Sequence, residues 1–165
     1  MPTQINGLPA HVLLIHLVVV LVPAAALLLV AQAWWPVARR RAGLLCPLLC
    51  LLALIAVPLT TNSGEWLQDR LSPSPLIDAH ARLGDQLLPW VAGLFVLSCA
   101  IWLLDRRTTP DRGRVVLTDA RGSAPVLLLA AILATVVAAG TIVQTYRIGD
   151  SGAKAVWTGT VPSES

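Results

Sequence analysis

The sequence predicts an all-α integral membrane protein, a bundle of four helices in a single domain. Of its 165 residues, 56% are hydrophobic and only 13% are charged, whereas a soluble domain carries roughly a quarter charged residues. The hydrophobic residues gather in four long runs without the period-2 alternation of a membrane β-barrel. Because a backbone in lipid must satisfy its own hydrogen bonds, these runs predict helices.

In chain order, the spanning helices are expected at residues 11–34, 42–59, 83–104 and 124–146. At about 1.5 Å of rise per residue, the apolar runs reach roughly 27 to 36 Å as helices, which matches a hydrocarbon core about 30 Å thick. Pro23 lies inside the first run and cannot give an amide hydrogen to the Val19 carbonyl, so we expect a kink there. Packing of the helices is enough to explain such a kink.

The segments outside the helices are too short to form a second domain. Residues 60–82 are expected to form the longest outer loop, with a turn at Ser72–Pro75. Residues 147–165 are expected to form a polar outer tail. Any chemistry must therefore take place in the bundle or on its outer face.

The charged residues predict the orientation in the membrane. The loops after the first and third helices hold eight basic and three acidic residues, a net charge of +5. The other segments hold four basic and six acidic residues, a net charge of −2. Because Arg and Lys in short loops stay on the cytoplasmic side, both termini are expected outside.

The composition predicts the lipid bilayer as the main partner of the chain. The net charge of +3 comes from short Arg clusters that flank apolar runs rather than from one basic face, so no nucleic-acid partner is expected. Trp34, Trp35 and Trp102 are expected at the inner membrane boundary and Trp90 near the outer one, as in an aromatic belt.

The three cysteines, Cys46, Cys50 and Cys99, lie in helices near the cytoplasmic end, where disulfides are not expected. Cys46 and Cys50 share a helix face, and with Cys99 they have the ligand type of a soft-metal site. No fourth ligand is visible at that depth. The interpretation that we favour is three small residues that pack in the bundle.

The three histidines, in contrast, all fall at the outer end of the bundle. His11 and His16 open the first helix, and His80 precedes the third. Five helical residues turn through about 500°, so His11 and His16 face one partner only if the helix begins between them. Pro9 is compatible with such a late start. An ionisable residue inside an apolar run, as His16 is, usually faces the bundle interior.

Carboxylates and a phenol accompany the histidines in this outer layer. The residues that the other helices bring there are Glu65, Asp85, Tyr146 and Asp150. Three interpretations follow from these residue types, besides conduction of protons or small molecules. His16 and His80 would be the axial ligands of a haem b, or His11, His16 and His80 with Glu65 or Asp85 would bind a single transition-metal ion. In the third interpretation, the same residues bind one another and cap helices, with no ligand.

Several motifs resemble a family of bacterial membrane proteins catalogued as domain of unknown function 2231. The first is the opening Asn6-Gly7-Leu8-Pro9-Ala10-His11 with His16 five residues later. Further motifs are Pro58-Leu59-Thr60-Thr61, Gly64-Glu65-Trp66-Leu67, His80, Leu83-Gly84-Asp85-Gln86-Leu87 and Arg147-Ile148-Gly149-Asp150-Ser151-Gly152-Ala153-Lys154-Ala155-Val156-Trp157. The resemblance therefore covers nearly the whole chain.

This resemblance implies a four-helix integral membrane protein without an established activity. Relatives are sometimes joined to Rieske-type iron–sulfur domains, which implies membrane redox work. The present chain has no iron–sulfur module. It also has Asp150 where the family often has a histidine, which weakens a ligand role at that position.

The sequence thus predicts a small multi-pass protein of the bacterial inner membrane, a haem- or metal-binding redox accessory rather than an enzyme. Its expected partners are the lipid bilayer and a membrane redox complex or further copies of itself. The alternative is a non-catalytic structural or assembly subunit of a larger membrane complex, without a cofactor.

Overall fold

The computed structural model describes residues 4–5, 7–108 and 120–158. The described part contains one short hairpin and six helices. These elements are β1 (Gln4–Ile5), β2 (Leu8–Pro9), α1 (Ala10–Trp34), α2 (Pro36–Ala42), α3 (Leu45–Gln68), α4 (Pro75–Asp85), α5 (Leu87–Thr108) and α6 (Ala120–Trp157).

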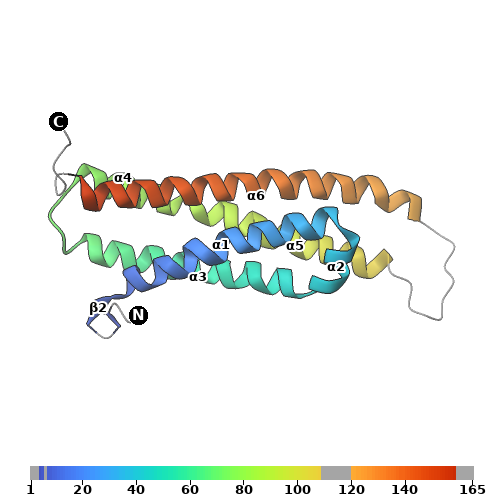
Figure 1. The fold of residues 1–165 in the computed structure, drawn as a ribbon, viewed down its shortest axis with the longest axis horizontal. Helices are drawn as coiled ribbons and strands as arrows, with labels where there is room; N and C mark the ends of the chain where they lie inside the picture. Colours follow the sequence, from blue (N-terminus) through green and yellow to red (C-terminus); the bar gives the residue numbers. More distant parts are fainter. Residues whose placement is uncertain (1–3, 6, 109–119, 159–165) are drawn as a thin grey trace.

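Four segments are long and apolar enough to cross a membrane: Ala10–Trp34, Leu45–Gln68, Pro75–Arg106 and Pro125–Trp157. They form an elongated bundle in which α4 and α5 follow one another as a single span (Figure 1). The bundle is closed because α1 packs on α3 and α6, and α5 also packs on both. The predicted all-α membrane bundle is therefore confirmed, and the chain is a multi-pass membrane protein.

Small residues make up much of the interior of the bundle, together with some large side chains such as Leu29 and Leu94, while many other large apolar side chains point outward. Ala25, Ala26 and Ala134 are fully buried, whereas Val20 and Leu27 are 70% and 62% exposed. This distribution suits a helix bundle in lipid, where close backbone approach rather than water exclusion holds helices together. Cys46 and Cys50 are free thiols buried in the same core, as expected for packing residues.

Both ends of the chain lead to the same end of the bundle, because α1 begins and α6 ends there (Figure 1). We call it the histidine end, since His11 and His80 lie there, and the opposite end, which carries α2, the arginine end. The predicted basic loop after the third span lies largely in residues 109–119, outside the described residues. Which end faces the cytoplasm therefore stays a prediction.

Two helices are longer than the apolar runs suggest, and two short helices, α2 and α4, lie where loops were expected. α3 continues to Gln68, and α6 continues to Trp157 into the expected polar tail. Between α3 and α5, α4 occupies most of the second half of the expected loop, although the turn before Pro75 is present. Polar side chains extend these helices because they pack on one another: the buried Gln144 donates to the Leu83 carbonyl at 2.8 Å.

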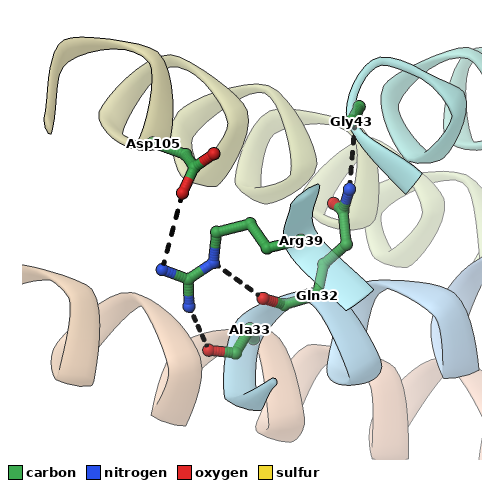
Figure 2. Close-up of polar contacts among 5 residues, drawn as sticks. All are labelled: Gln32, Ala33, Arg39, Gly43 and Asp105. Carbon is green, nitrogen blue, oxygen red and sulfur yellow. Dashed lines mark hydrogen bonds and ion pairs between the residues drawn. The ribbon is translucent and has the colours of Figure 1, made fainter. Parts of the chain in front are cut away.

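At the arginine end, one guanidinium holds the corner between α1 and α2 (Figure 2). Arg39 donates from Nε to the Gln32 carbonyl at 2.9 Å and from Nη2 to the Ala33 carbonyl at 2.7 Å. Its Nη1 lies 4.0 Å from Asp105 Oδ1 on α5. Gln32 Nε2 donates to the Gly43 carbonyl at 3.0 Å, and Gly43 adopts a φ of +44° that favours glycine. A cation thus caps the carbonyl end of α1 and ties it to α5.

Candidate functional site

Four helices meet around a pair of imidazole rings at the histidine end. His11 comes from the first turn of α1 and His80 from the middle of α4. The two ring centres lie 6.4 Å apart and the ring planes are nearly perpendicular, at 83°. Both residues are partly buried. The fold therefore brings together side chains that are far apart in the sequence.

Each imidazole is held by a hydrogen bond from Nδ1. His11 Nδ1 lies 2.9 Å from the Thr60 carbonyl on α3. Because a carbonyl can only accept, His11 carries its proton on Nδ1 in this contact. His80 Nδ1 lies 3.0 Å from Ser151 Oγ on α6. The Ser151 hydroxyl donates to the Ile148 carbonyl at 2.9 Å, so it accepts from His80.

The consequence is the same for both rings. With Nδ1 protonated and engaged, the lone pair of each neutral imidazole is on Nε2. His80 also forms a hydrogen bond with the Ile148 backbone. Nδ1–H bound to a backbone carbonyl or hydroxyl is also how metal-binding histidines are typically oriented.

Two glycines leave room for the rings. A Cβ at Gly64 of α3 would lie 2.9 Å from Cε1 and Nδ1 of His11, and a Cβ at Gly152 of α6 would lie 3.0 Å from Cε1 of His80. Both distances are shorter than ordinary van der Waals contact, about 3.5–4.0 Å. Any larger residue at either position would displace an imidazole ring.

Cavities lie on both sides of the imidazole pair. The outer one has a volume of about 220 Å³ and includes Glu65 and Asp85 in its lining. The inner one, about 60 Å³, reaches into the bundle and has mainly apolar walls. The residues that line both cavities are His11, Thr61, His80 and Gly84. The histidine pair therefore lies between a cavity that includes two carboxylates and an apolar recess.

His16 does not belong to this arrangement. It is exposed, lines neither cavity, and its Nδ1 donates within α1 to the Val12 carbonyl at 2.7 Å. α1 begins at Ala10, so both His11 and His16 are helical and differ by about 140° in direction. The expected pairing of His16 with His80 is thus replaced by a pairing of His11 with His80.

The expected five-residue metal site is not assembled either. Glu65 and Asp85 are exposed where they line the outer cavity. Within the described ranges, no group of three His, Cys, Asp or Glu side chains is placed to hold a metal ion. The same finding applies to Cys46, Cys50 and Cys99 in the described part of the chain.

Asp150 and Tyr146 line neither of the two cavities beside the pair. Asp150 Oδ2 accepts from Lys154 Nζ at 2.6 Å, one helical turn along. Both Asp150 and Tyr146 are exposed. Together with Ala153 they line a groove between α6 and α1.

Comparison with known proteins identifies the family. A family model described as "Predicted membrane protein (DUF2231)" matches residues 7–164, almost the entire chain. The chain belongs to the DUF2231 family. No curated protein and no solved structure matches it. The family description agrees with the four apolar spans, and it assigns no activity.

The structure shows which contacts some residues of the DUF2231-like motifs make around the imidazole pair. Gly64, in Gly-Glu-Trp-Leu, is the residue against which His11 packs. Ser151 and Gly152, in the motif that begins at Arg147, supply the hydroxyl and the open backbone next to His80. Sequence reasoning missed these residues because small side chains have no chemistry of their own. The signal that could have identified Gly64, Ser151 and Gly152 was their position within the motifs that resemble the family.

Proposed function

We propose that this DUF2231 protein holds a haem b between His11 and His80 and acts as a redox accessory in the bacterial inner membrane. The observation that supports this most is the pair itself, with ring centres 6.4 Å apart and both Nδ1 atoms engaged. The proposal keeps the cofactor expected from the sequence and changes one of its two ligands.

The spacing of the rings would allow His11 and His80 to hold one haem iron between them. Imidazole nitrogens on opposite sides of a metal, each about 2.0 Å from it, put the ring centres roughly 6 Å apart. The observed distance is 6.4 Å. Cavities of about 220 Å³ and 60 Å³ also adjoin the pair.

Haem fits this site better than a single metal ion does. A transition-metal ion bound by protein alone takes three or four side chains, and the described residues offer no such group. Haem iron needs only two axial ligands, since the macrocycle supplies the others. Two histidines from different helices of a bundle are therefore sufficient.

The chain itself would orient the cofactor and control its access to water. The Thr60 carbonyl and the Ser151 hydroxyl fix both imidazole rings and increase their basicity as ligands. The apolar walls of the inner cavity, such as Val18 and Leu87, exclude water from one side. When bound, haem supplies one-electron transfer. We infer that the histidine end faces outward and that a membrane redox complex or a second copy is the partner.

Absorption spectroscopy tests the proposal. Wild-type protein purified from haem-replete cells is expected to show a Soret band that His11→Ala and His80→Ala abolish. His16→Ala is the matched control, because it removes an imidazole from the same helix end, and it should keep the band. Thermal unfolding checks that each variant is folded.

Two results would contradict the proposal. Loss of the band in His16→Ala with retention in His11→Ala would overturn the ligand pair. Colourless wild-type protein without iron, copper or zinc by elemental analysis would overturn the cofactor, and would leave the structural or assembly subunit as the function.

A further inference from the structure

The arginine end carries two guanidinium groups that the fold does not use. Arg39 of α2 is engaged by the end of α1 and by Asp105 (Figure 2). Because successive helical residues are turned by about 100°, Arg40 and Arg41 point away from this corner, and both are exposed. Within the part of the chain that the structure describes, neither guanidinium has a hydrogen-bond or ion-pair partner. Both charges are therefore available to a ligand.

A third guanidinium lies nearby on α5. Arg106 follows directly after Asp105, which the contact with Arg39 places beside α2. Its guanidinium carbon lies over the Trp102 ring, 4.1 Å from the ring centre. A stacked guanidinium uses its flat face, so the N–H groups along its edge can still donate. Arg in this state matches the oxygens of a phosphate group.

The acidic residues at this end are too few to neutralise the basic ones. Residues 39–41 and 105–121 together hold eight basic and three acidic side chains. Even if every one of these carboxylates pairs with a cation, five positive charges remain. The net charge therefore favours an anionic partner.

Exposed apolar side chains accompany the cations and place them at the boundary of the bilayer. The membrane span α1 ends at Trp34, and Trp35, which is 60% exposed, leads into α2, as is typical of a membrane interface. Val37 precedes Arg40 and Arg41 by three and four residues, so it shares their side of α2. Val37 is 62% exposed. A partner with acyl chains beside an anionic head fits this combination better than a water-soluble polyanion does.

We propose that the arginine end binds the headgroup of an anionic phospholipid through Arg40, Arg41 and Arg106. The phosphate accepts hydrogen bonds from the guanidinium groups, and the acyl chains lie beside Val37. Arg clusters directly next to a membrane span are typical of sites for anionic lipids. The site lies at the opposite end of the bundle from the histidine pair, so this inference does not depend on the proposed haem.

Native mass spectrometry of the full chain in detergent tests the inference. Phosphatidylglycerol and phosphatidylcholine with the same acyl chains are titrated separately, and the dissociation constants of the first bound lipid are compared. Wild type is expected to prefer phosphatidylglycerol. Arg40→Gln combined with Arg41→Gln should weaken phosphatidylglycerol binding about 30-fold, since each Arg near an anionic lipid contributes a factor of about five. Phosphatidylcholine binding should not change.

Two further double variants are the controls. Arg82→Gln combined with Arg147→Gln removes two exposed guanidinium groups at the histidine end and should leave the preference for phosphatidylglycerol unchanged. Arg40→Lys combined with Arg41→Lys keeps both charges and should retain most of the binding. Arg106→Gln, on a different helix, should weaken binding about fivefold.

Three results would overturn the proposal. The first is equal affinity of the wild type for both lipids, which requires no variant to fold. The second is an equal loss of phosphatidylglycerol binding in the glutamine pair at α2 and in the pair at the histidine end. The third is a loss in the lysine pair as large as the loss in the glutamine pair, because charge would then not be the cause.

Discussion

Replacing Gly140 by alanine should destabilise the bundle through a clash with one tryptophan ring. Gly140 of α6 lies against Trp90 of α5, and a Cβ there would lie 2.7 Å from Cε3 of the indole and still closer to Cζ3 and Cη2. Overpacking of this kind costs about 1–3 kcal/mol. The gain in helix propensity from Gly to Ala returns up to about 1 kcal/mol. Taking the middle of both ranges, the net loss should be about 1–2 kcal/mol.

Thermal unfolding in detergent measures this loss. For a chain of this size, about 2–4 °C of Tm corresponds to 1 kcal/mol, so Gly140→Ala should lower Tm by roughly 2–8 °C. Gly149→Ala is the matched control on the same helix, since a Cβ there meets nothing within 4 Å, and its Tm should not fall.

A double-mutant cycle shows whether the ring is the cause. In a Trp90→Leu background, the cost of Gly140→Ala should largely disappear, because the atoms that clash are gone. The packing argument is refuted if Gly140→Ala lowers Tm equally in both backgrounds, or if it behaves like Gly149→Ala.

Three further predictions address other parts of the molecule. Gly152→Val should reduce the Soret band strongly by displacing the His80 ring, and a full band would contradict the close contact of 3.0 Å. Arg39→Ala should lower the free energy of unfolding by about 3 kcal/mol, since hydrogen bonds from charged groups are worth about 1.5–3 kcal/mol each. Arg40→Ala is the control, because Arg40 is exposed. Equal Tm values for the two variants would argue against the cap that Arg39 forms on the carbonyl end of α1. A reporter fused after Ser165 should be active only outside the cytoplasm, and cytoplasmic activity would reverse the predicted orientation.

The membrane spans could be predicted because the thickness and the apolar interior of the bilayer determine their length and composition. The helix ends could not, because polar residues after an apolar run form helix or loop depending on what packs against them. α4 is the clearest example. The sequence of α4 contains typical signals of a helix: Pro75 at the first position, Asp78 in the first turn and Arg82 in the last turn. These residues lie in a segment whose low hydropathy suggested a loop.

The candidate site depended on a helix register that the sequence left open. Whether α1 begins before or after His11 decides which histidine faces the bundle, and Pro9 is compatible with both. The structure places the start at Ala10, and the short hairpin of β1 and β2 leads directly into it. With that start, His11 faces α3 and His16 faces the lipid boundary.

His16 is tolerated there for a local reason. An unpaired imidazole in lipid is costly, but His16 satisfies one donor on the Val12 carbonyl of its own helix. It also lies only about 9 Å along the helix from Ala10, so its polar edge can reach the membrane interface as amphipathic side chains do. The chemistry of an imidazole inside an apolar run predicted that His16 is buried and functional. In the structure, His16 is the histidine whose removal should change the site least. His16→Ala is therefore the decisive comparison with His11→Ala.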